Sequence, residues 1–137
     1  MAIVLPRRAL RINKLEYLIK EDMNTKRICM ACDLKDNPDL IEEYKAYHAR
    51  GNAWPEITKS IKDGGIEDMQ IYLVGNRLFM IMEVNKTFDP EIKAKMDSAN
   101  PKVQEWETLM MKFQQYLPWA KDGEKWMPME QIFQLGD

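Results

Sequence analysis

Residues 66–84 read IEDMQIYLVGNRLFMIMEV, and this stretch decides the fold. Two apolar runs, residues 66–74 and 77–84, stand on either side of Gly75-Asn76. A glycine at the first position of a two-residue loop is typical of a type II′ turn between antiparallel strands. The stretch therefore predicts a β-hairpin at the centre of the chain.

The second run of the hairpin is apolar on both faces, because successive strand residues point to opposite sides of a sheet. Leu78, Met80, Met82 and Val84 fall on one face, and Phe79 and Ile81 fall on the other. A sheet of this kind needs cover on both sides. The helices of a chain of 137 residues can cover one side. We therefore expect the other side to pack against a second sheet, most simply in a homodimer.

Three pairs of residues predict helix starts: Asn37-Pro38, Asp89-Pro90 and Asn100-Pro101. Asn and Asp are preferred N-caps, and proline suits the first helical position because its missing N–H would have no partner there. The second of these helices is expected to end near Ser98, and the third to carry an amphipathic stripe. The stripe consists of Val103, Trp106, Met110, Phe113 and Leu117. A further helix is expected from Pro55 to Gly64-Gly65.

A strand at residues 27–34 and a last strand at residues 129–135 complete the order β-α-β-β-α-β. This order is that of a ferredoxin-like α+β sandwich, with an antiparallel sheet and helices on one face. Residues 23–137 are expected to form this single domain. Residues 1–22 are expected to be a loose arm, or to precede a true start at Met23.

Composition argues against two classes of partner. Hydrophobic residues make up 45% of the chain and charged residues 31%, and the net charge is −2. This is the balance of an ordinary globular protein, so we expect neither nucleic acid nor a membrane as a partner. No apolar run approaches the roughly 20 residues that span a bilayer, and we expect the protein in the cytoplasm.

Cys29 and Cys32 have the CxxC spacing of redox pairs and metal sites. In a strand, residues three apart point to opposite faces and lie about 10 Å apart, beyond the roughly 7 Å limit for a disulfide. We therefore interpret both as small buried hydrophobic residues. The single histidine, His48, cannot complete a tetrahedral metal site with them, so no metal is expected there.

Residues 44–56, YKAYHARGNAWPE, hold the candidate chemistry. Tyr44 and His48 lie four residues apart and therefore on one face of the first helix. Histidine exchanges a proton near neutral pH, and tyrosine can donate or accept a hydrogen bond. Gly51-Asn52 interrupts the helix, so that the pair could face a cleft. The spacing alone also fits a histidine that only packs at a helix end.

Several short pieces, in a consistent order, resemble the L-rhamnose mutarotase family between residues 27 and 135. They are Glu43-Tyr44, His48, Trp54-Pro55-Glu56, Ile71-Tyr72-Leu73, Leu78-Phe79, Trp106 and Ile132-Phe133. The resemblance implies a dimeric ferredoxin-like fold of the dimeric α/β barrel type. It also implies an enzyme that interconverts the α and β anomers of a 6-deoxyhexose without a metal or organic cofactor.

The resemblance assigns roles to three residues. His48 matches the family's proton-donating histidine, Tyr44 matches a sugar-binding tyrosine, and Trp106 matches the first of two adjacent tryptophans that contact the sugar. Mutarotation opens a hemiacetal, which needs one proton delivered to the ring oxygen and one removed from the anomeric hydroxyl. We expect His48 to protonate the ring oxygen. Tyr44 is expected to orient the sugar or to relay a proton, so both residues belong to the catalytic site.

Three departures from the family pattern change the pocket that binds the sugar. Glu107 replaces the second tryptophan, Met69 replaces a second tyrosine, and the interval from His48 to Trp54 is longer by two residues. Glu107 is expected either to be a solvated surface residue or, within the pocket, to accept hydrogen bonds from sugar hydroxyls. Met69 is expected to fill apolar space, against the sugar's methyl group where it meets the sugar. L-fucose is therefore a candidate substrate beside L-rhamnose. From proximity in sequence alone, a pocket rim is expected at Lys121, Lys125 and Trp126.

Two other functions stay open, because a fold does not fix a function. A small-ligand monooxygenase on the same fold would use His48 and Trp106 to hold an aromatic substrate. A non-catalytic sensing module would bind a sugar without turnover.

Overall fold

The computed structural model describes residues 25–136. The expectations for residues 1–22 and for a start at Met23 concern a segment outside this range. Between residues 25 and 136, no helix is both long and apolar enough to cross a bilayer.

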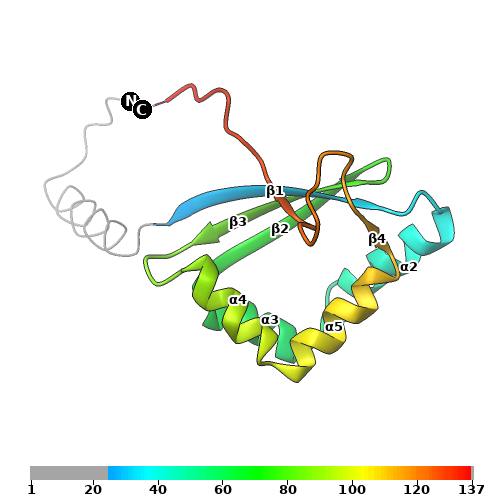
Figure 1. The fold of residues 1–137 in the computed structure, drawn as a ribbon, viewed down its shortest axis with the longest axis horizontal. Coiled ribbons are helices and arrows are strands. Elements are labelled where there is room, and N and C mark those ends of the chain that lie inside the picture. Colours follow the sequence, from blue (N-terminus) through cyan, green and yellow to red (C-terminus); the bar gives the residue numbers. More distant parts are fainter. Residues whose placement is uncertain (1–24, 137) are drawn as a thin grey trace, which may run out of the picture.

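The elements alternate as the sequence predicts, and they form one sheet covered by helices. In chain order they are β1 (Lys26–Leu34), α2 (Pro38–His48), α3 (Pro55–Asp63), β2 (Ile66–Val74), β3 (Arg77–Val84), α4 (Pro90–Ser98), α5 (Pro101–Met111), β4 (Gln114–Gln115) and β5 (Met127–Pro128). The strands pair in the order β2-β3-β1-β4, β5 also pairs with β1, and all these pairings are antiparallel. The helices lie together on one side of the sheet (Figure 1). The predicted ferredoxin-like α+β fold is confirmed.

The central hairpin closes through the predicted turn. Val74 pairs with Arg77, so Gly75 and Asn76 are the two loop residues. Gly75 has a φ of 58°, whereas no described residue other than glycine has a positive φ. This combination fits a type II′ turn and excludes type I′, in which both loop residues need a positive φ.

The two faces of the hairpin have different surroundings. The inner face of β3 is buried through Leu78, Met80, Met82 and Val84. On the outer face, Phe79 and Ile81 are only half-buried. Tyr72 of β2 pairs with Phe79 on this outer face and is 55% exposed, while Val74 at the strand end is 77% exposed. The helices therefore leave an apolar sheet face uncovered.

Each predicted N-cap side chain accepts hydrogen bonds from the first turn of its helix. Asn37 does so at α2, Asp89 at α4 and Asn100 at α5. The three helix starts are confirmed. At α3 the N-cap position is held by Trp54, whose side chain makes no cap hydrogen bond.

Helix α5 is shorter than its apolar stripe predicts. It ends at Met111, yet Phe113 and Leu117 beyond it are still buried. The chain leaves the helix because Gln114 pairs with Leu34 at the edge of β1. The last two positions of the stripe reach the core from the turn before β4 and from the loop after it rather than from the helix.

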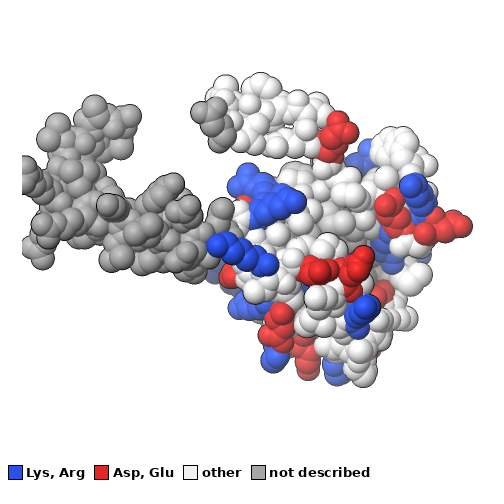
Figure 2. Space-filling model, turned by 60° about the vertical axis from the view of Figure 1, so that its left-hand side comes forward, with Lys and Arg blue, Asp and Glu red and all other residues white. Residues whose placement is uncertain are grey.

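The predicted last strand at residues 129–135 is wrong. The edge of β1 is already shared by β4 and β5, and the ladder stops at a 2.8 Å hydrogen bond from Met129 N to Cys29 O. Ile132, Phe133 and Leu135 are 88%, 74% and 91% exposed. The segment runs away from the sheet (Figure 1) and stands clear of the body of the molecule (Figure 2). The short strands β4 and β5 take the place of the last strand.

The two cysteines are free thiols on β1. Cys32 pairs with Leu78 on the inner face, and Cys29 pairs with Ile81 on the outer face. Cys32 is fully buried, and burial raises the pKa of its thiol to about 12. The predicted strand position is confirmed, although Cys29 is less buried than expected.

A buried carboxylate joins β1, β3 and the loop that follows β4. Asp33 is 4% exposed, and Nε and Nη2 of Arg77 donate to its two carboxylate oxygens at 2.8 and 3.1 Å. The Arg77 guanidinium also lies 5.2 Å from the ring centroid of Trp119. Farther along the same loop, Trp126 packs against both clusters of buried core residues. The loop is thereby held against the sheet.

We predict that Gly65→Ala destabilises the fold more than Gly75→Ala does. Both glycines have a positive φ, where alanine is strained by about 1 kcal/mol. A Cβ at Gly65 would also lie 2.8 Å from Asn85 Oδ1 and from Thr87 Oγ1, whereas at Gly75 nothing lies within 4 Å. Urea denaturation should show a further loss of about 1–3 kcal/mol for Gly65→Ala, because overpacking forces the backbone to shift. Equal losses would contradict this prediction.

Candidate active site

One pocket gathers the residues that the sequence predicted to act in catalysis or to bind the sugar. It has a volume of about 810 Å³ and is lined from both the inner sheet face and the helices. Tyr44, His48, Met69, Trp106 and Glu107 all line it. Residues 63 positions apart in the chain, from Tyr44 to Glu107, thus come to one cavity.

His48 is the last residue of α2, and its ring orientation is set by the helix. Its Nδ1 lies 2.8 Å from the carbonyl oxygen of Tyr44. Because a carbonyl can only accept, Nδ1 must carry the hydrogen. The neutral ring therefore has a bare Nε2. Burial lowers the pKa of His48, and the Tyr44 carbonyl acts weakly in the opposite direction, so the neutral form dominates at neutral pH.

Tyr44 places a phenol beside this imidazole. It is 4% exposed, and the centroids of its ring and of the His48 ring are 4.2 Å apart. Burial raises the pKa of Tyr44 to about 12, while a hydrogen bond from Gln114 opposes the shift. Nε2 of Gln114 donates to the Tyr44 hydroxyl at 3.5 Å, which leaves the hydroxyl hydrogen available for another acceptor.

Two tryptophans brace the other side of His48. The Trp106 ring meets the His48 ring edge to face, with centroids 5.4 Å apart. Trp54 packs on Trp106 at 5.0 Å. Between His48 and Trp54 the chain turns through Gly51, which has a φ of 86°, and Nδ2 of Asn52 donates to a carbonyl in the last turn of α2 at 2.8 Å. The interval between the two motif residues is thus a closed turn that brings Trp54 back against Trp106.

The mouth of the pocket carries opposite charges. Glu107 is exposed, and its Oε2 accepts a hydrogen bond of 3.4 Å from Gln104. Lys125 is half-buried and lines the same pocket, as does Trp126. Burial lowers the pKa of Lys125, while the Cys32 thiol and the Glu107 carboxylate act against that shift. Lys121 is exposed and does not line the pocket, so that part of the expected rim is wrong.

The pocket is rich in methionine. On the sheet side it is lined by Met30, Met69, Met80 and Met82, and on the helix side by Met110 and Met111 of α5. Met69 is half-buried on β2 and packs against the core cluster that contains Met80 and Met82. Thioether side chains are flexible and apolar, so this lining suits an apolar group of a bound molecule.

Gln114 is the contact of the site that sequence reasoning missed. It is 8% exposed and reaches Tyr44 from β4, a strand of two residues. A pair of glutamines gives no local sign of a strand. Its position follows from pairing with β1, which lies far away in the sequence.

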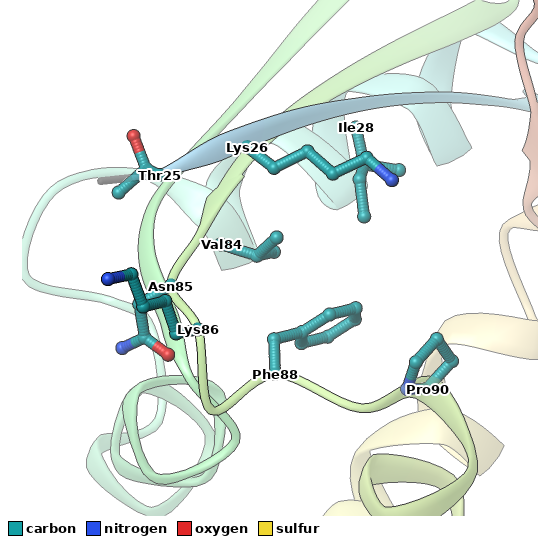
Figure 3. A pocket seen from close by; sticks show the side chains of 8 residues that line it. All are labelled: Thr25, Lys26, Ile28, Val84, Asn85, Lys86, Phe88 and Pro90. Atoms are coloured by element: carbon teal, nitrogen blue, oxygen red, sulfur yellow. The ribbon is translucent and has the colours of Figure 1, made fainter. Parts of the chain in front are cut away.

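A second, smaller pocket lacks groups for proton transfer. It has a volume of about 380 Å³, and Figure 3 shows Ile28, Val84 and Phe88 facing the same hollow. Its polar residues are Thr25, Lys26, Asn85 and Lys86, with no carboxylate, histidine or tyrosine. Within residues 25–136, no group of three or more His, Cys, Asp or Glu side chains could hold a metal ion. Acid–base chemistry therefore belongs to the larger pocket.

Comparison with known proteins points in one direction. A family model described as L-rhamnose mutarotase matches residues 27–135. An L-fucose mutarotase of Xanthomonas campestris pv. campestris is 39% identical over 115 residues, which cover 84% of this chain and 92% of that protein. An L-rhamnose mutarotase of Phocaeicola vulgatus is 30% identical over 98 residues, which cover 72% of this chain and 88% of that protein.

A solved structure shares the fold. The crystal structure of an L-rhamnose mutarotase from Formosa agariphila matches with a TM-score of 0.59 at 24% identity. The match covers 81% of this chain and 99% of that one.

We predict that the imidazole of His48 titrates below the pKa of histidine in the unfolded chain. His48 is the only histidine, so its NMR signals need no assignment. Long-range proton–nitrogen spectra should show the neutral ring protonated at Nδ1, because the Tyr44 carbonyl accepts that hydrogen. The same titration in urea supplies the reference. A normal or raised pKa, or a neutral ring protonated at Nε2, would show that the described geometry is not the one in solution.

Proposed function

Because this chain belongs to the L-rhamnose mutarotase family and is a sugar mutarotase, we propose that it interconverts the α and β anomers of a 6-deoxyhexose and that L-fucose is its preferred substrate. Family membership decides against the monooxygenase and the sensing module that the fold alone left open. The observation that carries the proposal is a bare imidazole nitrogen beside a protonated phenol in one pocket.

His48 is the residue that moves the proton. In its neutral form Nε2 can accept the hydrogen of the anomeric hydroxyl. The imidazolium so formed is a stronger acid than usual, because burial lowers its pKa. The ring oxygen is bonded to the same carbon as the anomeric hydroxyl, so the same nitrogen can deliver the proton there and open the ring. Closure on the other face of the aldehyde reverses these steps and gives the other anomer.

Tyr44 orients the sugar during this exchange. Its pKa of about 12 keeps the phenol protonated at neutral pH, so the hydroxyl can donate to an oxygen of the sugar while it accepts from Gln114. General acid–base groups typically contribute about 10²–10⁴-fold each. That range is sufficient for a reaction that free sugars already undergo slowly in water.

The remaining lining residues fit the two faces of a 6-deoxyhexose. Trp106 offers an aromatic wall next to His48, against which the C–H face of a sugar ring stacks. Met69 and its methionine neighbours offer an apolar surface for the methyl group at C6. Glu107 at the mouth can accept hydrogen bonds from hydroxyls.

Two observations favour L-fucose over L-rhamnose. The L-fucose mutarotase of Xanthomonas is 39% identical to this chain, against 30% for the L-rhamnose mutarotase of Phocaeicola. A carboxylate at Glu107 also replaces a stacking surface with a hydrogen-bond acceptor. The two sugars differ in the configuration of their hydroxyls, which is the property that a hydrogen-bond acceptor distinguishes.

We predict that His48→Asn abolishes anomer exchange and leaves the fold intact. Asparagine can still donate to the Tyr44 carbonyl, but its amide does not titrate, so we expect a loss of about 100-fold or more. The measurement is NMR saturation transfer between the two anomeric protons of L-fucose and, separately, of L-rhamnose. In the wild type the rate should rise with pH through the His48 pKa and then level, because only the bare Nε2 accepts a proton.

Three results would contradict the proposal. A His48→Asn protein with wild-type exchange would remove His48 from the chemistry. A rate that falls as pH rises would show that the imidazolium is the resting catalyst. Faster exchange of L-rhamnose than of L-fucose would remove the proposed preference.

A homodimer that forms through the outer face of the sheet is also part of the proposal. Its support is the half-buried Phe79 and Ile81 with the exposed Tyr72 beside them. Next to this face, residues 129–136 leave the sheet on the side opposite the helices (Figure 1), and Glu130 is their only charged residue. A second copy would remove these apolar groups from water. Location in the cytoplasm stays a prediction.

We predict that Ile81→Glu weakens this dimer, because it places a charge within the covered face. Ile92→Glu is the matched control, since Ile92 lies on α4 with 56% exposure and away from the outer sheet face. Light scattering coupled to size-exclusion chromatography should show a dimer for the wild type and the control and a monomer for Ile81→Glu. A monomeric wild type would refute the dimer.

A further inference from the structure

Lys125 enters the pocket from a segment with a fixed backbone. Just before it, the N–H of Glu124 donates to the carbonyl of Lys121 at 3.0 Å and closes a turn. Just after it, Trp126 packs against both clusters of the core, and Met127 pairs with β1. The backbone at Lys125 is therefore held between a closed turn and a strand of the sheet.

The charge of Lys125 has no partner among the described residues. Some described lysines pair with carboxylates, such as Lys93 with Asp97, Lys102 with Glu105 and Lys112 with Glu43. The other lysines of residues 25–136 that make no ion pair are exposed, apart from Lys125. Lys125 makes no ion pair or hydrogen bond within residues 25–136, although it is half-buried. A partly desolvated ammonium without a partner is costly, which indicates that a bound group completes its surroundings.

Glu107 faces the same space as Lys125 without touching it. Both side chains line the pocket, and the Glu107 carboxylate is near enough to act on the Lys125 ammonium. Their charged atoms are nevertheless more than the 4.0 Å of an ion pair apart, since no such pair joins them in the described part of the chain. A donor and an acceptor held apart fit hydroxyl groups, which accept from the ammonium and donate to the carboxylate.

The position of this pair relative to His48 indicates which hydroxyls it binds. Trp106 and Glu107 are consecutive on α5, so their side chains diverge by roughly 100° around the helix axis. Trp106 contacts His48, and Glu107 points to another part of the same pocket. When the anomeric carbon and ring oxygen of a hexopyranose lie at His48, C3 and C4 lie on the opposite side of the ring.

We propose that Lys125 is a specificity residue that, together with Glu107, binds the 3- and 4-hydroxyls of the sugar and selects the configuration at C4. This inference rests on the proposed function. In L-fucose these two hydroxyls are cis, and in L-rhamnose they are trans. The 4-hydroxyl accepts a hydrogen bond from the Lys125 ammonium, and the Glu107 carboxylate accepts from the neighbouring 3-hydroxyl.

The test removes the ammonium from the protein and the 4-hydroxyl from the sugar. Anomer exchange is measured with L-fucose and with 4-deoxy-L-fucose for the wild type and for Lys125→Met, Lys125→Arg and Lys121→Met. Lys121→Met is the matched control, because Lys121 lies in the same loop, is exposed and does not line the pocket. Circular dichroism and urea denaturation check the fold of each variant.

We expect Lys125→Met to lower kcat/KM for L-fucose by about 10- to 100-fold, the usual cost of losing a charged hydrogen bond to a hydroxyl. Most of the loss should appear in KM, and the pH midpoint set by His48 should not move. With 4-deoxy-L-fucose the same variant should match the wild type. Lys125→Arg should recover part of the loss, because it restores a donor, and Lys121→Met should change nothing.

The outcomes separate this inference from the proposed function. Equal losses with both sugars, or an unchanged Lys125→Met, would overturn the role of Lys125 while mutarotation stands. A wild-type protein without exchange of L-fucose would overturn both. If Lys125→Met fails to fold, Lys125→Arg decides: a larger loss of kcat/KM with L-fucose than with 4-deoxy-L-fucose supports the pair, and equal losses with the two sugars refute it.

Discussion

The site depends on one hydrogen bond, from Nδ1 of His48 to the carbonyl oxygen of Tyr44. A carbonyl oxygen has two lone pairs, so the Tyr44 carbonyl can accept from the imidazole as well as from a backbone N–H. The imidazole uses one of these lone pairs and thereby fixes its tautomer and the direction of Nε2. The same bond leaves Nε2 as the basic nitrogen of the ring, and His48 lines the pocket.

The packing around the imidazole decides how that nitrogen behaves. Tyr44 on one side and Trp106 on the other pack against the ring, and this partial burial lowers the pKa of His48 although the residue as a whole is still exposed. Trp54 supports Trp106 from behind. Two aromatic side chains, Tyr44 of α2 and Trp106 of α5, therefore contact the His48 imidazole directly, and Trp54 before α3 acts through Trp106.

The turn, the helix starts and the Tyr44–His48 pair could be predicted from the sequence, because each depends on residues that are close together in the chain. The turn at Gly75-Asn76 and the N-caps at Asn37 and Asn100 depend on neighbours in the chain. Tyr44 and His48 come together because residues four apart share a helix face. These features follow from spacing, and the structure contains them where the spacing places them.

The failures have a common cause in the edge of β1. Residues 129–135 have the apolar content of a strand, but the edge that could pair with them is taken by β4 and β5. Phe113 keeps the spacing of a helix stripe although the chain has already turned toward the sheet. Which segment pairs with the edge of β1 is decided by contacts between residues far apart in the sequence. The approach of Lys125 to Glu107 depends on such contacts as well.

The methionine lining of the pocket has a consequence for how such proteins diverge. Branched side chains would fix the outline of the cavity, and a new ligand would then require several coordinated replacements. Unbranched thioethers rearrange at little cost, so the part of the cavity that methionines line can adapt to a relocated methyl group without a change in the backbone. The preference for one sugar can then change through single substitutions of polar residues at the pocket mouth, while the residues that move the proton, His48 and Tyr44, stay the same.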